Sequence, residues 1–154
     1  MVEKKALFDR LLAEVKKSIE CDAAREETLL RICTLLRDRV PYYDWVGFYL
    51  VDGDRELVLG PFVGEPTAHI RIAFGRGICG QAAEKKEMFV VQDVSLETNY
   101  LSCSSKVQSE IVVPIFKNGE VVGELDIDSH VRSPFTEEDS VFLEEVCGVV
   151  SKLF

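Results

Sequence analysis

The sequence has no apolar run near the roughly 18 residues that a transmembrane helix requires, and no signal-peptide pattern. We therefore expect neither a membrane span nor export, and we expect the protein to be cytoplasmic. Basic residues are also scarce, since 18 Lys and Arg stand against 27 Asp and Glu and give a formal net charge of −9. Because no basic stripe appears along the chain, the sequence argues against direct binding of nucleic acid.

Paired cysteines are missing as well. The five cysteines are unevenly spaced and form no CxxC pair, which disfavours structural zinc, and we expect no metal in the site. In a cytoplasmic setting they should be reduced thiols unless one is catalytic. Cys21, Cys33 and Cys147 accompany predicted helices, and we predict that they are structural.

The 154 residues are enough for a single domain with one substantial core. Residues 1–40 are predicted to hold two helices, because apolar residues in the first recur every four positions and a second apolar stripe runs from about 23 to 40. A last helix is expected over 136–154, capped by Thr136. Residues 45–129 contain the predicted strands, and helix, core and helix use the whole chain.

Sequential strands joined by short turns imply an antiparallel sheet, and helices at both chain ends can cover one of its faces. The fold class is therefore α+β. A long polar loop at 93–108 and a short helix at about 81–86 would roof the opposite face, leaving a pocket between sheet and roof.

Residues 109–129 form the clearest hairpin, because two alternating apolar runs flank Asn118-Gly119. A two-residue turn at Asn118-Gly119 would mix acids with aliphatic side chains on each face, which a half-buried sheet tolerates badly. A three-residue loop at 117–119, with Gly119 in a bulge, leaves one face wholly apolar. Burial of that face is worth several kcal/mol at roughly 25 cal/mol per Å². We therefore predict the three-residue loop.

This register places Glu110 opposite Asp126, with Asp128 further along the same face. Like charges in these positions destabilise a sheet unless solvent, a cation or a raised pKa relieves them. The simpler interpretation is a solvated acidic face. The alternative is a site for a positively charged or proton-sharing ligand, in which at least one carboxyl group has a raised pKa.

Four other residues are candidates for this pocket. Trp45 and Tyr49 share one face of a predicted strand and could form a pocket wall, or simply pack under a helix. Cys79 stands at the predicted start of the short helix, where the helix dipole favours a thiolate. Cys103 lies in the polar loop near Lys106, which argues for access and a lowered pKa.

The order of elements resembles a GAF domain, and the motifs resemble its free methionine-(R)-sulfoxide reductase branch. The matching stretches are DWVGFYL at 44–50, LVLGPF at 57–62, GRGICG at 75–80, SEIVVPI at 109–115 and LDIDS at 125–129. LDID alone is common in GAF domains. Its combination with GRGICG and a cysteine six residues before SEI is much more specific.

The resemblance implies a thiol enzyme in which Cys103 attacks the sulfoxide sulfur and a second cysteine then forms a disulfide. The carboxylates matched by Glu110, Asp126 and Asp128 would hold the substrate ammonium and help to protonate the departing oxygen, beside an aromatic wall of Trp45 and Tyr49. It implies no bound cofactor and an external reductant of the thioredoxin type, and it allows a homodimer.

One position departs from the family pattern. The usual resolving cysteine is replaced by His69, whereas Cys79 is retained. Three alternatives remain open: Cys79 resolves Cys103, an external thiol does so, or the reductase chemistry is weakened or lost. A non-catalytic GAF sensor is therefore the second hypothesis, and a purely structural dimerisation domain would leave the acidic face unexplained.

Overall fold

The computed structural model describes residues 2–102 and 104–154. In chain order the elements are α1 (Val2–Glu20), α2 (Arg25–Arg39), β1 (Trp45–Val51), β2 (Glu56–Val63), β3 (Arg71–Ala73), α3 (Gly77–Lys85), β4 (Phe89–Val91), β5 (Ser109–Lys117), β6 (Glu120–Ser129) and α4 (Glu137–Val150). Short 3-10 turns occupy Val94–Leu96 and Ser151–Leu153.

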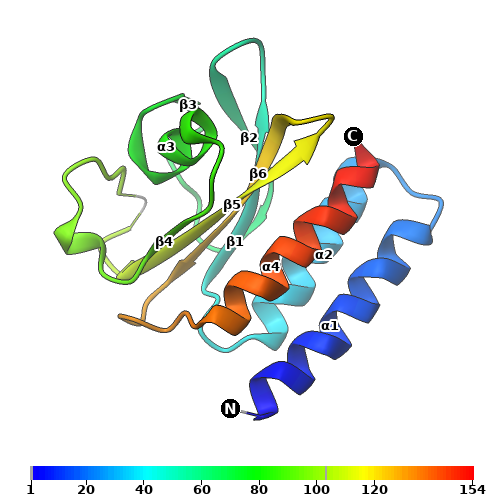
Figure 1. The fold of residues 1–154 in the computed structure, drawn as a ribbon. Helices are drawn as coiled ribbons and strands as arrows, with labels where there is room; N and C mark the ends of the chain where they lie inside the picture. Colours follow the sequence, from blue (N-terminus) through cyan, green and yellow to red (C-terminus); the bar gives the residue numbers. More distant parts are fainter. Residues whose placement is uncertain (1, 103) are drawn as a thin grey trace.

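The six strands form one antiparallel sheet in the order β3-β2-β1-β6-β5-β4. Helices α2 and α4 pack directly on one face, and α1 lies outside them as a further layer (Figure 1). Helix α3 contacts β5 and β6 from the opposite side. The predicted α+β class, antiparallel sheet and grouping of the terminal helices are confirmed.

Alternation along the central strands divides the apolar residues between the two faces of the sheet. Val46 and Phe48 of β1 belong to the large core under α1, α2 and α4, whereas Trp45 and Tyr49 belong to a smaller core under α3. Because successive side chains of a strand point to opposite faces, one seven-residue strand supplies both cores.

The last helix is held by the cap that the sequence predicts. Thr136 and Asp139 form a reciprocal capping box at the start of α4. The buried Asp139 carboxylate also accepts hydrogen bonds from the hydroxyl groups of Tyr42 at 2.7 Å and Tyr43 at 2.8 Å. These bonds tie α4 to the segment that leads into β1.

The faces of the β5–β6 hairpin are confirmed along β5 and from Gly123 onward in β6, but the predicted three-residue loop is wrong. The predicted faces of Val121 and Val122 are reversed, since Val122 packs against the large core and Val121 pairs with Phe116. Asn118 and Gly119 both have positive φ, 53° and 79°, so they form the two-residue turn that Asn-Gly favours. A bulge at Val122 then shifts the register, since Ile115 pairs with Gly123 but Phe116 pairs with Val121. The bulge restores a uniformly apolar inner face without a longer turn.

The bulge also changes which acids face each other. Glu110 lies opposite Asp128, and Asp126 lies opposite Val112. The predicted pairing of Glu110 with Asp126 is therefore wrong by two residues along β6, although all three acids remain on one face.

Gly47 of β1 should not tolerate a larger residue, because the Trp45 ring occupies the space that a side chain at this position would need. A Cβ at this position would lie 2.4 Å from the Trp45 ring and 2.8 Å from Phe62 Cβ. We expect Gly47→Ala to lower the free energy of unfolding by roughly 1–3 kcal/mol, the usual cost of overpacking, and to change the fluorescence of Trp45, the only tryptophan.

Gly148→Ala is the matched control, since Gly148 lies in α4 with open space around a new Cβ. It should leave stability unchanged or raise it by about 0.5–1 kcal/mol. Chemical denaturation followed by fluorescence measures both variants. Equal stability and unchanged spectra in the two would show that the Trp45 ring does not constrain Gly47.

Candidate active site

The outer face of the β5–β6 hairpin carries four buried carboxyl groups. The exposed fractions of these residues are 6% for Glu110, 0% for Glu124, and 2% each for Asp126 and Asp128. They lie beneath α3, so the interpretation as a solvated acidic face is wrong. Glu124, which lies opposite Pro114 in the structure, was not recognised as a site residue from the sequence.

Several carboxylate oxygens in this cluster lack a hydrogen-bond partner among the described residues. They are both oxygens of Glu124, Oδ1 of Asp126 and Oδ1 of Asp128. An unpartnered buried polar atom costs about 1–3 kcal/mol, and more when it is charged. The acid cluster therefore destabilises the fold, which is typical of a site kept for binding or catalysis.

Burial raises the pKa of Glu124, Asp126 and Asp128 above the ordinary values. The Asp126 charge raises the pKa of Glu124 and of Asp128 further, while hydrogen bonding with Glu110 offsets part of the rise at Asp126 and Asp128. The predicted raised pKa is confirmed. These shifts favour the protonated form of the carboxyl groups, from which a reacting group could receive a proton.

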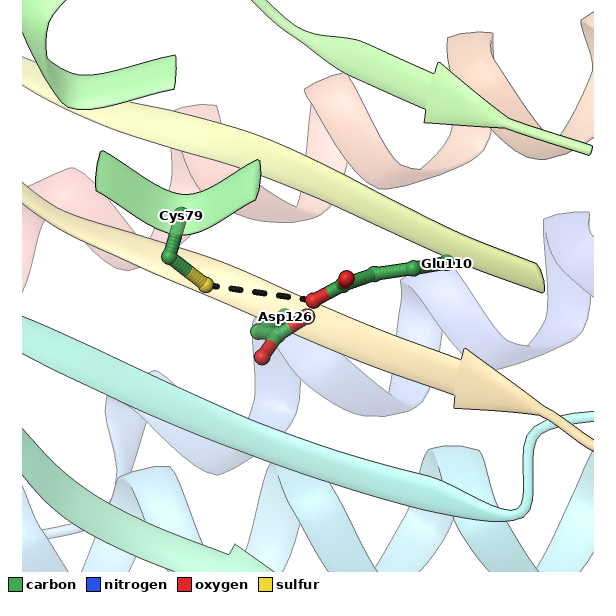
Figure 2. Close-up of side chains that lie close together, drawn as sticks. All are labelled: Cys79, Glu110 and Asp126. Carbon is green, nitrogen blue, oxygen red and sulfur yellow. Dashed lines mark hydrogen bonds between the residues drawn. The ribbon is translucent and has the colours of Figure 1, made fainter. Parts of the chain in front are cut away.

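Cys79 lies against this cluster from the α3 side. Its thiol donates to Glu110 Oε2 at 3.9 Å, and Asp126 lies beside them (Figure 2). The helix begins at Gly77, four residues earlier than predicted, so Cys79 belongs to its first turn. Burial, reinforced by the charges of Asp126, Glu124 and Glu110, raises the pKa of the Cys79 thiol well above its ordinary value. The predicted thiolate at this position is therefore wrong.

The start of α3 is fixed by the polar loop that follows β4. The Asn99 side chain accepts from the Gly77 amide and donates to the Gly75 carbonyl, both at 2.8 Å. Gln81 donates to the carbonyls of Gly77 and Asn99 at 2.9 and 3.0 Å. Asn99 and Gln81 thus position Cys79. Sequence reasoning missed both, because their partners are distant along the chain.

The aromatic wall is present, and both rings are anchored. Trp45 stacks on Phe62 with ring centroids 5.4 Å apart, and its indole nitrogen donates to the Glu65 carbonyl at 2.9 Å. The Tyr49 hydroxyl donates to the His69 carbonyl at 2.7 Å. Two rigid aromatic faces therefore flank the buried acids.

The predicted site residues line two cavities. The smaller has a volume of about 10 Å³, room for about one water molecule, and is lined in part by Tyr49, Cys79, Glu110 and Asp126. The larger, of about 110 Å³, is lined in part by Trp45, Glu65, Ser104 and Asp128. Glu110, which lines the smaller cavity, pairs across the strands with Asp128, which lines the larger one.

Cys103, the predicted nucleophile, lies outside the described residues. Its neighbours border both cavities, since Leu101 lines the smaller and Ser104 the larger. His69 contacts the carbonyl of Ser102 through Nε2 at 2.9 Å. Lys106, expected to influence Cys103, instead forms an ion pair with Glu65 at 3.2 Å.

The other three cysteines lie away from the acid cluster. Cys33 and Cys147 are buried in the large core, as predicted. Cys21 follows α1 and is exposed, so its assignment as a structural residue is wrong.

Comparison with known proteins identifies the family. A model of the GAF domain matches residues 5–153. The chain belongs to the GAF domain family. No helix in the described part of this GAF protein is both long and apolar enough to cross a membrane.

The structure also resembles a named branch of the family. Free methionine-R-sulfoxide reductase from Neisseria meningitidis, solved in complex with its substrate, is 39% identical with a TM-score of 0.93, over 98% of this chain and 90% of that chain. Free methionine-R-sulfoxide reductase from Escherichia coli is 38% identical over 82% of this chain and 75% of its own length. The resemblance drawn from the motifs is confirmed.

Other relatives carry only the domain name. GAF domain-containing protein A from Dictyostelium discoideum is 36% identical over 93% of this chain and 89% of its own length. The fold and family are therefore shared by proteins whose names state no reaction.

Glu124 should make stability depend on pH. A carboxyl group whose pKa is raised on folding stabilises the fold fully below its unfolded pKa, about 4.3 for Glu. This contribution is lost as the pH rises through the folded-state pKa. We expect Glu124→Gln to raise the free energy of unfolding at pH 7 by about 1 kcal/mol or more, and this gain to shrink towards pH 4.

Urea denaturation between pH 4 and pH 8 measures this effect. The control is Glu97→Gln, because Glu97 is an exposed acid of the polar loop. A Glu124→Gln difference that stays constant over this pH range would indicate a packing effect rather than the removal of a buried ionisable group.

Proposed function

We propose that the protein reduces free L-methionine-(R)-sulfoxide to methionine, using an external thiol as the source of electrons. The observation that carries the proposal is the buried acid cluster beside two aromatic rings. Carboxyl groups of this kind suit a small ligand that brings an ammonium group and a sulfoxide oxygen in need of a proton. The reductase names of relatives at 38% and 39% identity support the same reaction.

Glu110, Asp126 and Asp128 are the proposed ligands of the substrate ammonium and the proposed source of the proton. One oxygen each of Asp126 and Asp128 lacks a hydrogen-bond partner among the described residues. An incoming ammonium group would provide a positively charged hydrogen-bond donor for these oxygens. Trp45 and Tyr49 would contact the apolar part of the substrate and exclude water. The proposed site thus combines charge recognition with an apolar wall, as small-molecule sites commonly do.

Cys103 is the proposed nucleophile. Its sulfur would attack the sulfoxide sulfur, forming a transient S–S bond and passing the thiol proton to the acid cluster, while the cluster donates a proton to the sulfoxide oxygen. The protonated oxygen would then transfer to the Cys103 sulfur as the S–S bond and the sulfoxide S–O bond break, which leaves methionine and a sulfenic acid on Cys103. Methionine sulfur is reduced and Cys103 sulfur is oxidised. A second thiol then forms an S–S bond with Cys103 and releases water, after which a thioredoxin-type dithiol returns both thiols to the reduced state.

The test is turnover of free L-methionine-(R)-sulfoxide with dithiothreitol as reductant, using the (S) epimer as substrate control. We expect methionine to form from the (R) epimer only, and Cys103→Ser to abolish the reaction. Cys21→Ser, at an exposed thiol outside the site, should retain it. Full turnover by Cys103→Ser would contradict the enzyme proposal.

The acids should contribute to turnover as proton donors. We expect Asp126→Asn and Asp128→Asn each to reduce turnover at least about tenfold, the lower range of general acid catalysis. Glu97→Gln, in the exposed part of the loop, is the control and should leave turnover unchanged. Unchanged rates in both Asp variants would reduce the cluster to a structural feature.

Cys79 is the proposed resolving thiol, because it alone among the four described cysteines lines the acid pocket. Treatment with substrate and no reductant should consume two thiols and give a Cys79–Cys103 disulfide, found by peptide mapping. This requires the two Cα atoms within about 7 Å. If Cys79→Ser keeps full turnover with an external thiol, resolution is intermolecular and the assignment of Cys79 fails.

A ligand-binding sensor is the second candidate function. The observation that favours it is His69, which stands at the position of the family's usual resolving cysteine. Binding of free methionine sulfoxide without turnover, under conditions where dithiothreitol keeps all thiols reduced, would establish this alternative.

A further inference from the structure

We infer that Cys79, Glu110 and Asp126 form a binding site for Zn²⁺ at the floor of the acid pocket. The three residues come from α3, β5 and β6, so the site is independent of the cysteine spacing along the chain that argued against structural zinc. It lies within the site of the proposed function and would regulate it, but the binding itself does not depend on the reductase reaction.

The ligand atoms already lie close together. One atom each from Cys79, Glu110 and Asp126 lie within 4.8 Å of one another, and all three residues are buried (Figure 2). The Cys79 sulfur is 3.9 Å from Glu110 Oε2. Tetrahedral Zn²⁺ with Zn–S near 2.3 Å and Zn–O near 2.0 Å places sulfur and oxygen about 3.5 Å apart. A contraction of about 0.4 Å would therefore bring the Cys79 sulfur and Glu110 Oε2 to the separation that two zinc ligands need.

The cavity beside these residues has the size of a single ion. Its volume is about 10 Å³, room for one water molecule or one metal ion.

Unpartnered oxygens provide a second, independent observation. Asp126 Oδ1 and both oxygens of Glu124 are buried without a hydrogen-bond partner among the described residues. Glu124 lies near both Cys79 and Asp126. Its charge raises the pKa of the Cys79 thiol, and the charge of Asp126 raises the pKa of Glu124. A dication bound by Cys79, Glu110 and Asp126 would give Asp126 Oδ1 a partner and would lower the cost of the nearby Glu124 charge.

The ligand set selects for zinc among common divalent cations. Thiolate ligands favour Zn²⁺ over Mg²⁺ and Ca²⁺, which prefer sites made of oxygen alone. Binding would replace the proton of the Cys79 thiol by the metal, forming an S–Zn bond and releasing H⁺ to solvent. The bound thiolate could no longer attack a sulfenic acid, so Zn²⁺ should inhibit the proposed reductase reversibly.

Co²⁺ is the first probe, because a cobalt–thiolate bond gives a charge-transfer absorption in the near ultraviolet. Titration of the reduced, metal-free protein with Co²⁺ should give this absorption at one equivalent, and Zn²⁺ should remove it by displacement. Cys79→Ser should abolish the absorption and weaken Zn²⁺ binding at least about tenfold. Asp126→Asn should weaken binding while the absorption remains at saturation.

Cys21→Ser, at an exposed thiol outside the site, is the control and should keep both the absorption and the affinity. Circular dichroism establishes that each variant is folded. The inference is overturned if wild-type protein binds no Co²⁺ or Zn²⁺ at one equivalent, or if the absorption survives in Cys79→Ser.

Turnover measured in the presence of a chelator separates the two proposals. A protein that turns over but binds no Zn²⁺ contradicts this inference alone. A protein that binds Zn²⁺ through Cys79 but does not turn over contradicts the proposed function alone.

Discussion

Burial of four carboxyl groups on one face of a hairpin is the constraint on which the rest of this structure depends. The opposite face of the same two strands is wholly apolar between Ile111 and Ile115 and packs into the main core. Successive side chains of a strand point to opposite faces. Burial of the apolar side chains in the main core therefore forces the acidic side chains onto the face beneath α3. The hydrophobic energy of one face therefore holds an unfavourable arrangement of charges on the other.

Helix α3 and the polar loop after β4 cover the acids and keep water away from them. Asn99 and Gln81 bond the polar loop to the first turn of α3, and this turn carries Cys79 against the cluster. In such surroundings the neutral forms of the carboxyl groups and of the thiol are favoured over the charged forms. A cationic ligand or a metal ion would reverse this preference, which connects binding to proton release.

The sequence could predict the layers, most of the strand faces and three of the four buried acids, Glu110, Asp126 and Asp128, because these follow from alternation and helix periodicity. Glu124 was missed. Trp45 and Tyr49 share one face of a strand as predicted, and α4 begins with the predicted cap at Thr136. The register of β5 and β6 could not be predicted, since the bulge at Val122 depends on packing of both strands at once. The state of Cys79 was also missed, because a local rule about helix ends does not include the distant carboxylates that surround it.

The central claim is that the buried acids form a recognition site for a free amino-acid ammonium group. It is tested most directly by calorimetric titration of the Cys103→Ser variant with L-methionine-(R)-sulfoxide and with its N-acetyl derivative, which lacks the positive charge. The account predicts binding of the free amino acid and loss of most of that affinity on acetylation. Equal affinity for both compounds would contradict it.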